Sequence, residues 1–157
     1  MFGECPWDRV EIIVDIQKLK EKFPCGFPVE RLPEGAKEEN IVAYRICRSG
    51  AVEAASFLPT YLDEISRTKE NENEVQDIGH YSLSVFEKES EARRMLKFFR
   101  GKQPCAIAAK GSTDASCGMT QRTKERTGTK SSHIDWWLYD GAAPHLFFNM
   151  VDMEKAE

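Results

Sequence analysis

A strand that passes directly into a helix is the feature that most constrains the fold of this chain. Residues 79–86 alternate apolar and polar side chains, which is typical of a half-buried strand. Residues 87–100 then repeat apolar side chains every three or four positions, which is typical of an amphipathic helix. We therefore predict that Tyr81, Leu83 and Val85 face the core and that a helix follows at once.

The ends of this helix also have sequence signals. Ser84 and Glu87 have the spacing of a capping box, in which each side chain bonds a free backbone N–H of the other residue. Gly101 follows the last apolar repeat and is expected to end the helix.

The rest of the chain offers a mixture of helical and strand patterns. Asp8 is expected to cap a first helix that ends before Pro24, although the β-branched run at 10–14 would also suit a strand. Short helical segments are expected at 51–57 and 60–65. Strands are expected at 41–48, 104–110, 133–139 and 145–151, the last two joined as a hairpin through 140–144. Residues 67–77 and 111–132 are polar or rich in glycine, serine and threonine, and we expect surface loops there.

These elements predict one α+β domain over residues 1–157, with a mostly antiparallel sheet packed by two or three helices. The chain has 157 residues, of which 41% are hydrophobic, and this is enough for one ordinary core. Its net charge of -4 disfavours nucleic acid as a partner. It has no apolar run of about 20 residues, so we expect no membrane association.

Cysteine usage and the first residues point to a cytoplasmic protein. The five cysteines have wide spacings and form no CxxC motif, which indicates reduced thiols. The start of the chain lacks the basic and hydrophobic parts of a secretory signal. A zinc site from Cys105, Cys117 and His133 is a weak alternative, because its spacing fits no standard ligand pattern, and we predict no metal. Cys117 as a nucleophile with His133 as its base is a further alternative without support from spacing.

The candidate site collects polar residues from several expected strands. His133 and Asp135 are two positions apart on one strand and would face the same way, so that the carboxylate could orient the imidazole; we name them as catalytic candidates. Trp137 and Tyr139 continue that face and would stack on a base or a nicotinamide ring. Candidate ligand-binding residues on the other strands are Arg45, His80, Tyr81 and Ser82.

Arg45 has two interpretations. It lies on a strand that is otherwise largely apolar, where an unpaired guanidinium would be costly. A salt bridge to a carboxylate at the edge of the core would satisfy it. A phosphate or other anion would satisfy it equally well, because the planar guanidinium binds phosphate through two hydrogen bonds.

The stretch 120–130 is basic. It carries Arg122, Lys124, Arg126 and Lys130, and its alternation allows a hairpin over part of its length. A solvated flexible loop is one interpretation. A basic lid over an anionic ligand, formed by Arg122, Lys124 and Arg126, is the other.

Residues 41–100 resemble the layout of small ADP-ribosyltransferase-like domains. The resemblance lies in a strand with Tyr44-Arg45, a helical segment, and Gly79-His80-Tyr81-Ser82-Leu83-Ser84 leading into the helix with Ala92. It implies an NAD pocket in which Arg45 contacts phosphate and Tyr81 or Ser82 contacts the ring. The late glutamate of the family has no clear counterpart, since only Asp135 or Glu125 is available.

Three classes of function follow from these patterns. The first is an enzyme that handles nucleotides or other anionic small molecules, with an NAD-using transferase as its narrowest form and NAD as its cofactor. The second is a non-catalytic protein-binding module of bacterial or phage type, which would use loop 120–130 and the aromatic C-terminal hairpin. The third and weakest is a nucleic-acid binder. An enzyme should place His133 and Asp135 in a cleft with Arg45, whereas a binding module should present a flat aromatic patch.

Overall fold

The computed structural model describes residues 16–62 and 77–153 of the chain. Its centre is one sheet of six strands in the order β4-β5-β2-β1-β3-β6. Every pairing is antiparallel, which confirms the predicted α+β class with an antiparallel sheet. The strands are β1 (Val42–Cys47), β2 (Leu83–Phe86), β3 (Ile107–Ser112), β4 (Gly118–Arg122), β5 (His133–Leu138) and β6 (Phe148–Val151).

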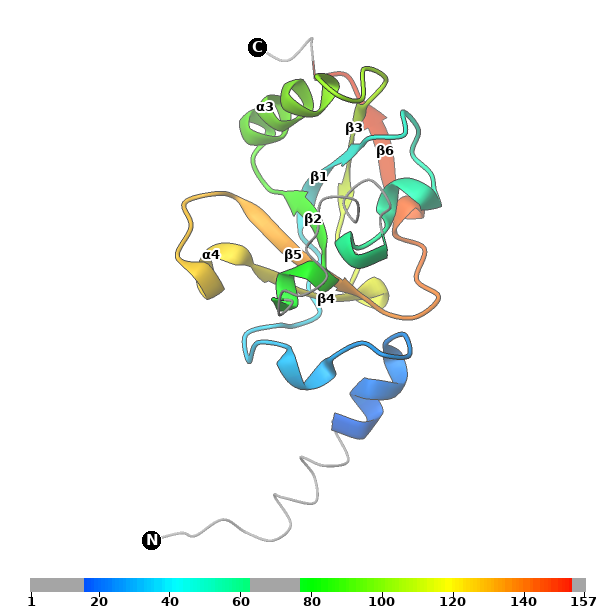
Figure 1. Ribbon diagram of the computed structural model, residues 1–157, viewed down its shortest axis with the longest axis vertical. Coiled ribbons are helices and arrows are strands. Elements are labelled where there is room, and N and C mark those ends of the chain that lie inside the picture. Colours follow the sequence, from blue (N-terminus) through cyan, green and yellow to red (C-terminus); the bar gives the residue numbers. More distant parts are fainter. Residues whose placement is uncertain (1–15, 63–76, 154–157) are drawn as a thin grey trace, which may run out of the picture.

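Helices lie at both ends of the sheet and at one of its sides. Residues 16–22 are helical and lie at the opposite end of the molecule from α3 (Glu89–Arg100), while α4 (Thr123–Thr127) projects beside β4 and β5 (Figure 1). Short 3₁₀ helices fill the connections: η1 (Val29–Arg31), η2 (Ala54–Phe57), η3 (Thr60–Leu62), η4 (Ile78–Tyr81), η5 (Ala115–Cys117) and η6 (Pro144–Phe147). Within 16–62 and 77–153, none of the helices has the length and apolar character needed to cross a membrane.

The sheet is covered on both faces. On one face, α3 packs Ala92 and Leu96 against Tyr44 and Phe86. On the other face, Leu83 and its neighbours pack against η2, in a cluster that includes Ala43, Phe57, Leu83, Val85, Ile134, Trp136 and Phe148. Two covered faces explain why the central strands read as nearly continuous apolar runs.

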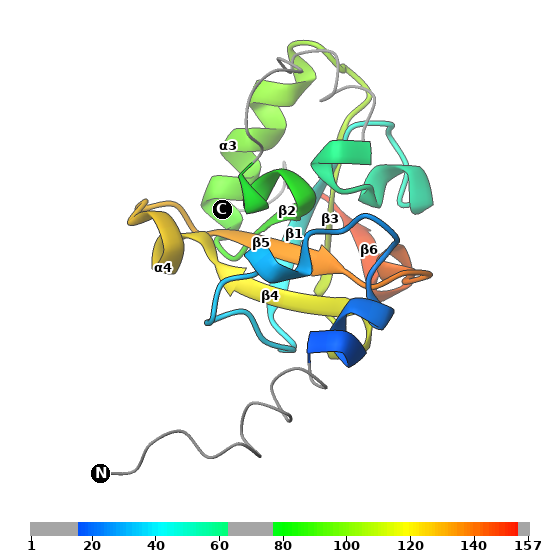
Figure 2. The ribbon, with the colours of Figure 1, turned by 60° about the horizontal axis from the view of Figure 1, so that its bottom comes forward.

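The N-terminal segment builds a third part of the core. Phe23 and Phe27 stack with their ring centroids 4.3 Å apart and pack in one cluster with Ile78 and Trp137. Trp137 is fully buried, and its indole N–H donates to the Ile78 carbonyl oxygen over 2.9 Å. Figure 2 shows this segment crossing in front of β4 and β5. The segment therefore covers the part of the sheet that α3 does not reach.

The predicted C-terminal hairpin is wrong. β5 pairs with β2 and β4, whereas β6 pairs, within the described residues, with β3 alone at the far edge of the sheet. Residues 144–147 form η6 rather than the start of a strand. The two segments are close in sequence and share strand-like composition, but pairing partners are chosen by the packing of the whole sheet and not by chain proximity alone.

The expected loop 111–132 contains regular structure. It includes the end of β3, η5, β4 and α4, and β4 pairs with β5 over five residues. The expected hairpin within 120–130 is instead a strand followed by a helix that ends at Gly128, whose φ of 77° is in the left-handed region that favours glycine.

The boundaries of the strand–helix feature also differ from the prediction. Residues 78–81 form η4, so the strand begins at Leu83, and it continues through Ser84 to Phe86. The helix begins at Glu89 with Lys88 as its N-cap, so the Ser84–Glu87 capping box does not form. Gly101 does end the helix, although with φ -61° rather than a left-handed conformation.

Other boundaries were predicted more closely. The strand expected at 41–48 is β1, and the strand expected at 104–110 begins later, at Ile107. The helical segments expected at 51–57 and 60–65 are the 3₁₀ helices η2 and η3, the second described as far as Leu62. Residues 16–22 of the expected first helix are helical. The start of that helix, and residues 67–76 of the expected loop 67–77, lie outside the described residues.

Candidate functional site

A buried carboxylate organises the polar contacts at one end of β5. Asp135 is 1% exposed and accepts hydrogen bonds at both oxygens. Oδ1 accepts from the Ser82 hydroxyl over 2.8 Å, and Oδ2 accepts from the Thr123 hydroxyl over 2.9 Å and from Arg126 Nη2 over 2.7 Å. A charged group at this depth is tolerated because it is ion-paired and its lone pairs are occupied.

Arg126 connects this carboxylate to a second one on the other side. Its Nη1 donates to Asp77 Oδ2 over 2.7 Å, and Asp77 also accepts from the Gly79 backbone N–H over 3.1 Å at the start of η4. A Cβ on Gly79 would lie 2.9 Å from Arg126 Nη2 and 2.9 Å from Asp77 Oδ2. The absence of a side chain at position 79 therefore allows α4, η4 and β5 to be joined by one guanidinium.

His133 lies at the edge of this network. Its Nδ1 is 2.5 Å from the Thr123 hydroxyl oxygen, and its ring meets Phe86 edge-on with centroids 5.5 Å apart. Burial lowers the pKa of His133, and this effect outweighs the opposing influence of Asp135 and Glu91. Burial therefore favours the neutral form of this imidazole.

A basic hollow of about 390 Å³ opens next to His133. The residues that line this basic hollow are Glu87, Lys88, Arg122, Lys124, Lys130, Ser131, Ser132 and His133. Arg122 is held by Glu87, with Nε 2.7 Å from Oε1, and lies 3.8 Å from Glu39. Lys88, Lys124 and Lys130 have no ion pair with any residue in the described ranges 16–62 and 77–153.

The wall of the basic hollow is held in place by Glu91 in the first turn of α3. Its Oε1 accepts from the Ser132 backbone N–H over 2.7 Å and from the Ser132 hydroxyl over 2.6 Å, and its Oε2 accepts from the Ser131 hydroxyl. Burial by itself would raise the pKa of Glu91, but these hydrogen bonds outweigh it, and the pKa is lowered. The loop 128–132 is thereby tied to the start of α3.

A second, apolar pocket of about 260 Å³ lies elsewhere and shares no lining residue with the basic hollow. Three tyrosines line it, Tyr61, Tyr81 and Tyr139, and the rings of Tyr61 and Tyr81 are 4.9 Å apart. The Tyr139 hydroxyl donates to Glu38 over 2.6 Å, and burial together with this carboxylate raises the tyrosine pKa. The pocket is a separate feature with little charge.

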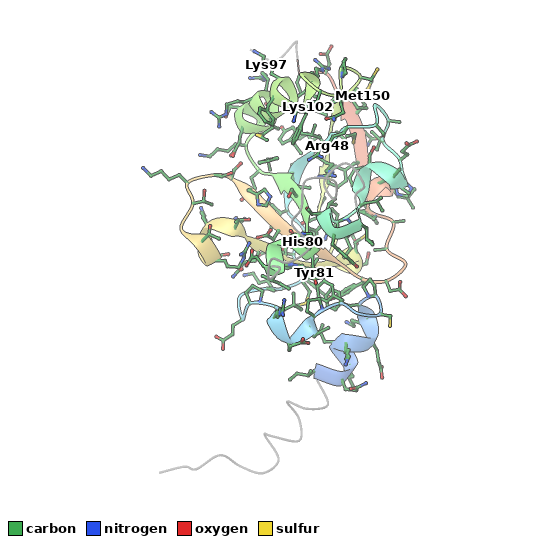
Figure 3. All side chains as sticks on the ribbon, viewed as in Figure 1. Arg48, His80, Tyr81, Lys97, Lys102 and Met150 are labelled. Atoms are coloured by element: carbon green, nitrogen blue, oxygen red, sulfur yellow. The ribbon has the colours of Figure 1, made fainter. Side chains whose placement is uncertain are left out.

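The predicted site residues fall into separate groups. Ser82, Asp135 and Arg126 are joined in the buried network, while Arg122 and Lys124 line the basic hollow; His133 belongs to both. Tyr81 and Tyr139 line the apolar pocket. Trp137 is buried in the core. His80 lies beside Tyr81 on η4, away from the α3 end of the molecule, where Figure 3 labels Arg48, Lys97 and Lys102.

Arg45 does not join His133 and Asp135. Phe86 lies opposite both Tyr44 and His133 in the strand register, so these side chains share one face of the sheet and Arg45 points to the other. Arg45 is 9% exposed and donates to the carbonyl oxygens of Ser56 and Ser84 over 2.9 and 3.0 Å. The expected cleft that combines Arg45 with His133 and Asp135 is therefore not formed.

Some residues of the site had no clear signal in the sequence. Thr123 is the central one, because its hydroxyl contacts both His133 and Asp135 from α4. Lys88, Ser131 and Ser132 also line the basic hollow. Lys130 also lines the hollow and was not named as a candidate, although its place in the basic stretch was a signal. Long-range contacts of this kind depend on how α4 folds back over β5, which no local pattern encodes.

The two cysteine hypotheses do not fit the geometry. Among the residues that the structure describes, no group of three metal-ligating side chains could hold an ion, which excludes the zinc site from Cys105, Cys117 and His133. Cys117 precedes the end of β4 that pairs with Leu138, whereas His133 is at the opposite end of β5. Burial also raises the pKa of Cys117, which disfavours the reactive thiolate.

Comparison with protein-family models, with curated proteins and with solved structures found no match to this chain. The resemblance to ADP-ribosyltransferase-like domains therefore remains a hypothesis, and the function must be argued from the site itself.

Proposed function

We propose that this protein binds a small phosphate-bearing molecule, of the nucleotide class, in the basic hollow. One observation carries the proposal: Lys88, Lys124 and Lys130 line the same hollow and have no carboxylate partner within residues 16–62 and 77–153. An isolated surface lysine is simply hydrated by water. Three unpaired ammonium groups around one concave surface favour an anion that bridges them.

The charge balance of the hollow supports this assignment. Four cationic side chains and one carboxylate, Glu87, line it, whereas the whole chain has a net charge of -4. A volume of about 390 Å³ is within the range of small-ligand sites. The Ser131 and Ser132 hydroxyls in the same wall donate to Glu91, so the cationic side chains are the donors that face a phosphate.

NAD remains one member of this ligand class, and a transferase that uses it remains the narrower hypothesis. Asp135 is too buried to touch a ligand and is occupied by Ser82, Thr123 and Arg126, so we assign it the role of holding the site together. Of the two catalytic candidates, only His133 lines the hollow.

Binding can be tested by thermal unfolding of the purified protein with NAD, AMP, ADP and ribose 5-phosphate. A ligand at about a hundredfold excess over its Kd should add about 2.7 kcal/mol to the free energy of unfolding. The double variant Lys124→Ala/Lys130→Ala should raise the Kd by about tenfold or more, because two phosphate contacts are lost.

Lys97→Ala/Lys102→Ala is the matched control. Both of these lysines are exposed and lie at the α3 end, so the double substitution changes the net charge equally without touching the hollow (Figure 3). Equal weakening in both double variants would mean that only the overall charge matters. No stabilisation of the wild-type protein by any of the four ligands would contradict the proposal.

A second candidate function is association with a protein partner, favoured by the exposed edge at β6. In the described part of the chain, no strand pairs with the outer side of β6. Leu146 and Met150 are 73% and 67% exposed there, and Met150 is labelled on β6 in Figure 3. Exposed sheet edges are templates for strand addition by another chain.

This alternative makes a distinct prediction. Capture of a specific partner that is lost in Leu146→Asp/Met150→Lys and retained in Lys124→Ala/Lys130→Ala would support it. Equal capture by the wild-type protein and by both variants would contradict it.

A further inference from the structure

The Thr123 hydroxyl lies between two groups that compete for its single proton. Its oxygen is 2.5 Å from His133 Nδ1 and 2.9 Å from Asp135 Oδ2. Asp135 is ion-paired with Arg126 and accepts from Ser82 and Arg126, so as a carboxylate it has no proton to donate. Thr123 must therefore donate to Asp135, and its oxygen must accept from an N–H at His133 Nδ1.

This arrangement decides which nitrogen of the neutral imidazole carries the proton. With the proton on Nδ1, Nε2 presents a lone pair. Nε2 has no hydrogen-bond partner among the residues that the structure describes, and His133 lines the basic hollow. The hollow thus combines ammonium groups, which attract a phosphate, with one neutral acceptor, which requires a donor.

We propose that the ligand of the basic hollow is a phosphorylated sugar, free or as part of a nucleotide, whose hydroxyl group donates to His133 Nε2 while its phosphate lies on the lysines. Thr123 is the positioning residue that holds the required tautomer. This inference rests on the proposed function and deepens it by naming a hydroxyl donor next to the phosphate. An anion without a donor would leave the Nε2 lone pair unsatisfied, which weakens binding.

The tautomer can be measured without a ligand by ¹H–¹⁵N NMR of the histidine rings at about pH 8, above the ordinary histidine pKa. The three histidines can be assigned through His80→Gln and His145→Gln. We expect a protonated Nδ1 and an unprotonated Nε2 at His133. Thr123→Ser should keep this pattern, and Thr123→Val should lose it. A protonated Nε2 in the wild-type protein would overturn the inference.

The ligand class can be measured by calorimetry with two matched probes at about pH 8. Ribose 5-phosphate has ring hydroxyls, whereas tetrahydrofurfuryl phosphate has the same ring and phosphate without them. We expect ribose 5-phosphate to bind about tenfold more tightly to the wild-type protein and to Thr123→Ser. In Thr123→Val, whose His133 Nε2 is no longer held as an acceptor, the ratio should fall to about one.

The outcomes separate the two proposals. Equal binding of the two probes to the wild-type protein, weakened equally by Lys124→Ala/Lys130→Ala, would retain phosphate binding and overturn the sugar-hydroxyl assignment. Binding of neither probe, together with no stabilisation by NAD, AMP or ADP, would overturn both.

Discussion

Asp135 is the residue on which most polar contacts of the site depend. Its two oxygens hold Ser82, which lies between η4 and β2, and two residues of α4, Thr123 and Arg126. The sequence indicated that Asp135 and His133 share a strand face, and the register confirms this. The sequence could not indicate that the carboxylate is buried, because burial depends on α4 and η4 covering that face.

We predict that Asp135→Asn destabilises the protein by about 3–5 kcal/mol, because the Arg126 guanidinium loses its buried partner and the amide cannot accept at both positions. Urea unfolding monitored by tryptophan fluorescence would measure the change. Asp140→Asn removes the same charge at an exposed position and should cost less than about 0.5 kcal/mol. Similar losses in the two variants would contradict the assigned role of Asp135.

Among the secondary-structure elements, α3 and the loop 128–132 act together. Glu91 in the first turn of α3 accepts from Ser131 and Ser132. The backbone N–H of the N-cap residue Lys88 donates to the Ser132 hydroxyl, so a distant loop anchors the start of the helix in place of the predicted capping box. Ser84 is unavailable as a cap because it pairs with Asp135 inside the sheet. Local spacing suggested Ser84 as the partner of the helix start, and the tertiary structure supplied Ser131 and Ser132.

This contact predicts a pH dependence. The pKa of Glu91 is lower in the folded protein than its ordinary value of 4.5, so the unfolded state binds more protons in acid. The stabilisation by Glu91 is complete above the unfolded pKa and is lost as the pH falls through the folded pKa. Glu91→Gln should therefore reduce the fall in the free energy of unfolding below about pH 4.5.

Urea unfolding at several acidic pH values would test this prediction. Glu89→Gln is the matched control, since Glu89 is in the same helical turn but pairs with Arg93 at an exposed position. An acid dependence in Glu91→Gln identical to that of the wild-type protein would contradict a stabilising role for the ionised carboxylate.

At the scale of the whole molecule, stability is concentrated in the middle of the sheet. β2 and β1 are central strands covered on both faces, and Leu83 is 0% exposed within the main hydrophobic cluster. The edge near β6 is different, because Leu146 is 73% exposed. The same substitution should therefore cost much more stability at Leu83 than at Leu146.

We predict that Leu83→Ala lowers the free energy of unfolding by about 2–5 kcal/mol, through lost burial and the cavity left behind. Leu146→Ala should change it by less than about 0.5 kcal/mol. Chemical denaturation of both variants would give the comparison. A large loss for Leu146→Ala would show that η6 is covered in solution by another surface.

The sequence alone determined the α+β class, the amphipathic helix, the strands β1, β2 and β5, and the basic character of 120–130, because periodicity and charge are local properties of the chain. Only the tertiary structure decided that β6 pairs with β3, that Arg45 points away from His133, and that Thr123 reaches Asp135. These features depend on contacts between residues far apart in sequence, and their energies come from burial and pairing in the complete sheet.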